Sequence, residues 1–103
     1  VGSPGGAMII HFTAKTLYGV LNWGLSPQQA IDLPNFGNVG GPVVLEEQRF
    51  APPTVAALRA RGAEVREQAL TSGLQAIVRK VDNGKPVWIS GADPRREGVV
   101  LGE

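Results

Sequence analysis

Residues 73–90 read GLQAIVRKVDNGKPVWIS, and this stretch decides the type of sheet that the chain builds. Two apolar runs flank the tetrapeptide Asp82-Asn83-Gly84-Lys85. Asn-Gly between two apolar runs is a strong hairpin signal, because both central residues of the tight turn need a positive φ. The segment therefore predicts an antiparallel hairpin that turns at Asn83 and Gly84.

The longest apolar stretch, residues 7–23, is expected to form a helix. Most of its residues are good helix formers, its apolar side chains lie nearly all round, and Gly24 follows just past its end. This distribution indicates a buried helix. The periodicity leaves a strand open at the start of the stretch, where three residues are β-branched: Ile9, Ile10 and Thr13.

A second, shorter helix is expected to begin after Ser26. Ser26 is a good N-cap, Pro27 suits the first turn, and Gln29 stands where a capping box has Glu or Gln. Pro34 keeps this helix short, because the residue before a proline avoids the helical conformation.

The remaining segments predict an α+β chain. Residues 51–53, Ala-Pro-Pro, begin a third helix, and residues 43–46 and 64–68 are short strand candidates. We therefore expect residues 1–103 to form a single domain with two to three helices and an antiparallel sheet that includes the hairpin.

Composition excludes several classes of function. Lys and Arg number 10 and Asp and Glu 9, and this net charge of +1 argues against a nucleic-acid-binding surface. The absence of Cys excludes disulfides, a thiolate zinc site and a Cys nucleophile, and one His is too few for a His-rich metal site. No segment resembles a signal peptide or has the roughly 20 apolar residues that span a bilayer. We expect no metal, cofactor, nucleic-acid partner or membrane association.

Charge is concentrated in the second half of the chain. Residues 1–45 carry only two formal charges, Lys15 and Asp32, and residues 46–103 carry the other seventeen. A surface helix normally has a charged face, and a domain of this size buries only about 60–65% of its unfolded surface. The uncharged stretch therefore indicates the interior of a larger protein or an interface. It predicts that the isolated chain self-associates or is only marginally stable.

The sequence Gly2-Ser3-Pro4-Gly5-Gly6 precedes the first helix and is the best candidate for a site. The N–H groups at a helix N-terminus are unpaired and partly positive, and glycine lets a ligand approach closely. Such a site suits a phosphate, a carboxylate or the oxyanion of an acyl-transfer intermediate. No Gly-Lys-Ser/Thr follows, which excludes a P-loop. The simpler alternative is a turn that leads into a helix.

Two other candidates have simple structural explanations. His11 is the only imidazole, and nothing in its spacing selects one of the serines as a nucleophile, so a packing histidine is the favoured interpretation. The sequence Asp93-Pro94-Arg95-Arg96 could present a guanidinium to a carboxylate. The favoured interpretation is a turn capped by Asp93, with arginines on the surface or in ion pairs.

Three motifs together resemble the C-terminal stretch of gamma-glutamyltranspeptidases. They are Gly2-Ser3-Pro4-Gly5-Gly6 followed by Ile9-Ile10, then Gln28-Gln29-Ala30-Ile31-Asp32 with Pro34 and Phe36, and Gly91-Ala92-Asp93-Pro94-Arg95-Arg96 with Gly98. Their order and approximate spacing match over nearly the whole chain. The resemblance implies part of an N-terminal-nucleophile hydrolase, an αββα sandwich, with residues 1–103 as the C-terminal portion of the small subunit.

The resemblance also implies a role for the glycines. In that family a precursor cleaves itself, and the new N-terminal Thr of the small subunit attacks the gamma-glutamyl amide of glutathione-like substrates. The Gly-Gly of the first motif supplies N–H groups to the oxyanion hole, which assigns that role to Gly5 and Gly6, with Ser3 as a candidate neighbour of the substrate. The implied partners are the substrate, the large subunit and the N-terminal part of the small subunit. The implied location is the periplasm or the cell exterior.

Because the implied nucleophile lies upstream, the isolated chain is expected to be inactive. Departures from the family pattern leave two alternatives open. Ala7 and Met8 stand where the family often has a small polar residue and Arg. In the family a His often follows the Pro-x-Phe motif, and Gly37 stands there instead. The first alternative is a fragment of a related acylase with a different amide substrate. The second is a non-catalytic assembly or binding module, with the uncharged first 45 residues as its contact surface.

Overall fold

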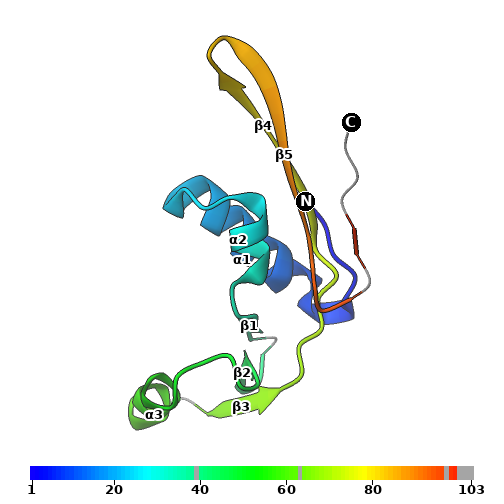
Figure 1. The fold of residues 1–103 in the computed structure, drawn as a ribbon. Coiled ribbons are helices and arrows are strands. Elements are labelled where there is room, and N and C mark those ends of the chain that lie inside the picture. Colours follow the sequence, from blue (N-terminus) through cyan, green and yellow to red (C-terminus); the bar gives the residue numbers. More distant parts are fainter. Residues whose placement is uncertain (39, 63, 97, 100–103) are drawn as a thin grey trace. The chain divides into compact units, whose positions relative to one another are not determined.

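The computed structural model describes residues 1–38, 40–62, 64–96 and 98–99, and these residues form two compact units. Unit 1 consists of Val1–Leu33 and Thr71–Glu103, and unit 2 is Pro34–Leu70. The chain therefore begins unit 1, builds unit 2 and then returns to complete unit 1 (Figure 1).

The helices of unit 1 follow the sequence signals closely. A short 3-10 helix, η1 (Gly6–Met8), leads directly into α1 (Ile9–Trp23). The helix predicted over residues 7–23 is thus confirmed, and a strand at its start is wrong. The capping box is also present at α2 (Pro27–Asp32), where Ser26 Oγ accepts from Gln29 N at 3.2 Å and Ser26 N donates to Gln29 Oε1 at 3.0 Å. No helix in the described ranges is long and apolar enough to cross a membrane.

The predicted hairpin is confirmed. Strands β4 (Gln75–Asp82) and β5 (Lys85–Ala92) pair antiparallel, and Asn83 and Gly84 have φ values of 50° and 77°. Gly2 forms an isolated antiparallel bridge to Gln75, with N···O distances of 3.1 and 2.9 Å. The N-terminal loop is therefore attached to the beginning of β4.

The core of unit 1 lies between one face of α1, α2 and one face of the hairpin. Its buried apolar side chains are Phe12, Ala30, Ile31, Leu74 and Ala76. The expectation that α1 is buried nearly all round is wrong for this chain, because α2 covers only one side of it. Several large apolar side chains of unit 1 are exposed: Ile10, Leu17, Tyr18, Leu21 and Trp23 on α1, and Ile77, Val81 and Trp88 on the hairpin.

Unit 2 is a small sheet with one helix. Its strands are β1 (Phe36–Gly37), β2 (Val43–Glu46) and β3 (Val65–Gln68), and its helix is α3 (Pro52–Ala60). Strand β1 pairs antiparallel with β2, whereas β2 and β3 are parallel and are connected through α3, as a parallel pair requires. The predicted α3, β2 and β3 are confirmed. The sequence predicted only antiparallel pairing, and the parallel pair of β2 and β3 was not predicted. This pair belongs to the sheet of unit 2, which is separate from the hairpin.

Candidate functional site

Gly5 and Gly6 occupy backbone conformations that favour glycine, but for different reasons. Gly5 has a φ of 144°, and a Cβ there would lie 2.7 Å from Cε2 of the buried Phe12 ring. Gly6 has a φ of 58°, and a Cβ there would meet nothing within 4 Å. The close approach of a ring therefore requires glycine at position 5, whereas only the left-handed φ favours it at position 6.

The two glycines also present consecutive amide groups at the beginning of η1. Met8 N donates to Gly5 O at 3.1 Å, and Ile9 N donates to Gly6 O. Within the described residues, the N–H groups of Gly5 and Gly6 donate to no backbone carbonyl, as expected for the first residues of a helix. These two N–H groups are donors that an anion can accept from.

The loop of residues 2–6, hereafter the glycine loop, is fixed by Ser3. Ser3 Oγ donates to Pro4 O at 2.7 Å and accepts from Gly73 N at 3.0 Å. With the bridge between Gly2 and Gln75, the glycine loop is attached at two successive points to the segment that enters β4.

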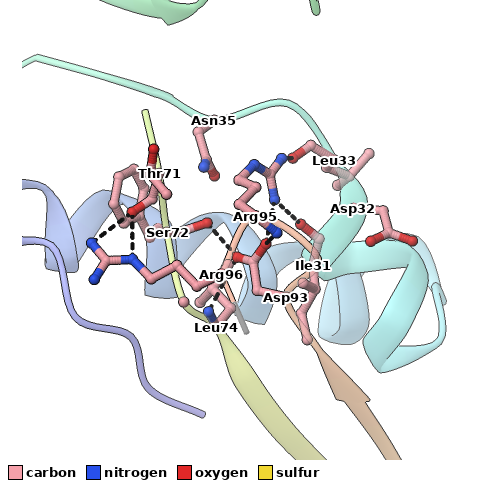
Figure 2. A network of polar contacts seen from close by, with 12 residues as sticks. Ile31, Asp32, Leu33, Asn35, Thr71, Ser72, Leu74, Asp93, Arg95 and Arg96 are labelled. Carbon is pink, nitrogen blue, oxygen red and sulfur yellow. Dashed lines mark hydrogen bonds and ion pairs between the residues drawn. The ribbon is translucent and has the colours of Figure 1, made fainter. Parts of the chain in front are cut away.

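Asp93 is the centre of a buried polar network that reaches this same segment (Figure 2). Its Oδ2 accepts from Ser72 Oγ and from Leu74 N, the latter at 3.1 Å, and its Oδ1 accepts from Arg95 N and Arg95 Nη1, both at 3.0 Å. Burial raises the pKa of Asp93, but the hydrogen bonds from Ser72, Arg95 and Leu74 outweigh it and hold the pKa below its ordinary value. The predicted turn capped by Asp93 is confirmed, and its carboxylate is ionised at neutral pH.

Arg95 and Lys15 bind the carbonyl groups at the end of α2. Arg95 Nη1 donates to Ile31 O at 3.0 Å and Nη2 donates to Leu33 O at 2.9 Å. Lys15 Nζ donates to the same two carbonyls, both at 2.9 Å. Cations are favourable at a helix C-terminus, where carbonyl groups lack partners. Arg95 thus has the internal ion pair that the sequence favoured, rather than an open position for a substrate carboxylate.

The sequence did not identify Lys15 and Ser72 as parts of this network. Lys15 is 7% exposed, although its residue type is rarely buried. One signal was available, since Lys15 is the only Lys or Arg in residues 1–45. His11 lies on α1, half-buried, as the sequence favoured. In the part of the chain that the structure describes, no three His, Asp or Glu side chains gather in a way that could hold a metal ion.

Comparison with solved structures assigns the fold to the N-terminal-nucleophile hydrolases. A mutant gamma-glutamyltranspeptidase of Helicobacter pylori matches with a TM-score of 0.87 and 21% identity, over 92% of this chain and 52% of that one. The family model for gamma-glutamyltranspeptidase matches residues 1–103. The chain therefore belongs to the gamma-glutamyltranspeptidase family.

Two further relatives show how much of such proteins the chain represents. It is 31% identical to the glutathione hydrolase proenzyme of Pseudomonas sp. (strain A14), over 99% of this chain and 19% of that protein. A cephalosporin acylase from Bacillus halodurans matches with a TM-score of 0.84 and 27% identity, over 97% of this chain and 19% of the acylase. The chain is thus similar to a small part of larger enzymes.

Proposed function

We propose that this chain supplies the oxyanion-stabilising part of a gamma-glutamyl transferase or hydrolase that acts on glutathione-like amides. The observation that carries the proposal is the pair of N–H donors of Gly5 and Gly6 at the beginning of η1, in a chain of this family. Preorganised backbone donors stabilise the negative charge that develops on the substrate oxygen during acyl transfer. The likeness to a glutathione hydrolase proenzyme supports the choice of substrate class.

Donors of this kind stabilise an oxyanion but do not generate one. That step needs a nucleophile and a base. We infer that a Thr nucleophile and the groups that bind the glutamyl moiety belong to the large subunit and to the N-terminal part of the small subunit. Residues 1–103 would then be one portion of an αββα domain, inactive alone.

The exposed apolar surfaces of unit 1 support this assignment of partners. The register places Arg79 opposite Trp88 and Val81 opposite Pro86, so the hairpin face with Val81 and Trp88 is the one opposite to the face with Gly91. Gly91 approaches the backbone of α2. The other face exposes the apolar side chains of Ile77, Val81 and Trp88, and in a two-sheet sandwich such a face packs against the second sheet. The outer face of α1 is exposed in the same way.

The test removes one N–H group without adding a side chain. In the full-length, self-processed enzyme, glycolic acid in place of Gly6 converts the amide to an ester and leaves the volume unchanged. With a chromogenic gamma-glutamyl anilide, kcat should fall about 10²–10³-fold, with little change in the melting temperature. The same ester at Gly41, in an exposed loop of unit 2, is the control and should leave kcat unchanged. A normal kcat for the Gly6 ester, per processed molecule, would refute the proposal.

The likeness to a cephalosporin acylase favours a second candidate, in which the same donors serve a different amide. The full-length enzyme should be compared on a gamma-glutamyl anilide and on anilides of other acyl groups. A higher kcat/KM for the gamma-glutamyl anilide supports the first candidate, and the reverse order supports the acylase. No turnover of any anilide would favour a non-catalytic assembly module.

A further inference from the structure

We propose that Ser3 and Asp93 are positioning residues for the oxyanion donor at Gly5. They act through a relay of hydrogen bonds, which runs from the Asp93 carboxylate through residues 72–74 to Ser3 and ends at the peptide group that carries the Gly5 N–H. This inference rests on the proposed function, since it concerns how one of the proposed donors is aimed.

The relay ends at the peptide between Pro4 and Gly5. The Pro4 carbonyl and the Gly5 N–H belong to one planar trans peptide unit, in which C=O and N–H point in opposite directions. Ser3 Oγ donates to Pro4 O at 2.7 Å. Because this bond fixes the carbonyl, it also fixes the direction in which the Gly5 N–H points. Glycine has no side chain with which to restrict its own peptide group, so the restriction comes from Ser3.

The middle of the relay is the bond from Gly73 N to Ser3 Oγ, 3.0 Å long. A serine hydroxyl has one proton to donate. Since Ser3 Oγ accepts from Gly73, its proton remains for the Pro4 carbonyl, and the accepted bond strengthens the donated one. The two backbone segments are closely packed here, because a Cβ on Gly73 would lie 3.0 Å from Cγ and Cδ of Pro4.

The relay begins at Asp93, which fixes the residues on both sides of Gly73. A single oxygen, Oδ2, accepts from Ser72 Oγ and from Leu74 N. With both flanking residues held by one fully buried carboxylate, Gly73 has little freedom to turn its N–H away from Ser3. The hydrogen bonds from Ser72, Arg95 and Leu74 keep the carboxylate charged in this buried place, where hydrogen bonds are electrostatically stronger than in water.

The experiment uses the full-length, self-processed enzyme and separates kcat from KM. Ser3→Ala removes the hydroxyl that holds the peptide group of Gly5. The bond from Gly5 N–H to the oxyanion should then be weakened, and we expect kcat to fall about 10-fold, the size of one hydrogen bond in the transition state, with KM unchanged. Ser3→Thr restores a hydroxyl and should restore kcat. Asp93→Asn tests the beginning of the relay and should also lower kcat with KM unchanged. If Asp93→Asn fails to fold, Ser72→Ala serves instead, because it removes one donor to Asp93 and keeps the carboxylate.

Two further measurements distinguish a loss of positioning at the glycine loop from a general loss of stability. Val55→Ala, in α3 of unit 2, should lower the melting temperature and leave kcat per processed molecule unchanged. Amide hydrogen exchange of residues 2–8 reports on the glycine loop without any substrate. It should become faster in Ser3→Ala and Ser72→Ala, and in Val55→Ala it should not.

The outcomes divide clearly. Lower kcat with unchanged KM, rescue by Thr and faster exchange of the glycine loop support the relay. A second ester, with glycolic acid in place of Gly5, removes the N–H group that the relay would orient. If this Gly5 ester has lost activity, a normal kcat in Ser3→Ala overturns the relay, whether or not the melting temperature is lowered. If the Gly5 ester keeps its kcat, the proposed oxyanion role of Gly5 fails instead. Exchange then decides the relay alone: faster exchange supports the positioning, and unchanged exchange overturns it.

Discussion

Replacing Gly5 by Ala should damage the fold more than replacing Gly6 by Ala, although the two residues are adjacent. A Cβ at position 5 would lie 2.7 Å from Cε2 and 3.1 Å from Cδ2 of Phe12. The Phe12 ring is 2% exposed and belongs to the core, so it has no open space into which to move. Either the ring or the glycine loop must therefore shift in Gly5→Ala, and neither needs to shift in Gly6→Ala.

The expected magnitudes follow from two costs. Overpacking a core typically costs about 1–3 kcal/mol, and holding a non-glycine residue in the sparsely populated conformation of Gly5 adds about 1–3 kcal/mol. Gly5→Ala should thus lower the free energy of unfolding by about 2–6 kcal/mol. Gly6 has a φ of 58° and open space around its Cβ. Ala in that left-handed conformation costs about 1–2 kcal/mol.

Scanning calorimetry of the full-length enzyme measures the difference. In a domain of about 150–250 residues, each kcal/mol moves the melting temperature by about 2–4 °C. Gly6→Ala should therefore lower it by about 2–8 °C, and Gly5→Ala by about 4–24 °C. The fraction of self-processed protein should follow the same order. A melting temperature for Gly6→Ala equal to or below that of Gly5→Ala would refute the steric argument.

Three further outcomes are expected. The isolated chain should not turn over a gamma-glutamyl anilide, and turnover above a heat-killed control that is abolished by a substitution within the chain would contradict this. The isolated chain should self-associate in light scattering over a concentration series, and Trp88→Lys should reduce the association; a wild-type monomer at every concentration would show that the exposed surfaces are not adhesive. For Asp93, whose folded pKa is lowered, the stabilisation is complete above the pKa of an unfolded Asp, about 3.9, and is lost as the pH falls through the folded pKa. The melting temperature of the full-length enzyme should therefore fall more steeply in acid than that of Asp93→Asn, and parallel curves would count against this.

Elements fixed by neighbouring residues were predictable from the sequence. The turn at Asn83 and Gly84 depends on two residues that accept a positive φ, and both have one. The capping box of α2 depends on Ser26 and Gln29, three positions apart, and both of its hydrogen bonds are present. In each case the interaction that defines the element lies within a few residues, so the local sequence contains the whole signal.

Features that depend on distant residues were not predictable in the same way. The bond from Ser72 to Asp93 joins residues 21 positions apart, and Lys15 reaches carbonyls 16 and 18 positions away. The periodicity of apolar residues describes only near neighbours in the sequence, so it does not predict contacts between such distant residues. For the same reason the two glycines could be singled out as candidate donors, whereas the support that Ser3 receives from Gly73, 70 positions away, could not.

Within unit 1, residues from the three motifs that carried the family resemblance pack together. Gln28, from the second motif, binds both backbone groups of Ala92 in the third, accepting from Ala92 N at 2.9 Å and donating to Ala92 O at 2.8 Å. A Cβ on Gly91 would lie 2.8 Å from Gln28 N, so this approach requires glycine. The third motif reaches back through Arg95 to α2 and through Asp93 to the segment that holds the glycine loop. Gln28, Gly91, Asp93 and Arg95 therefore hold parts of unit 1 together, and Asp93 also holds the segment to which the glycine loop is attached. It follows that substitutions in the second and third motifs should first change how the donors are held, and the choice of substrate should depend on residues that contact it elsewhere in the enzyme.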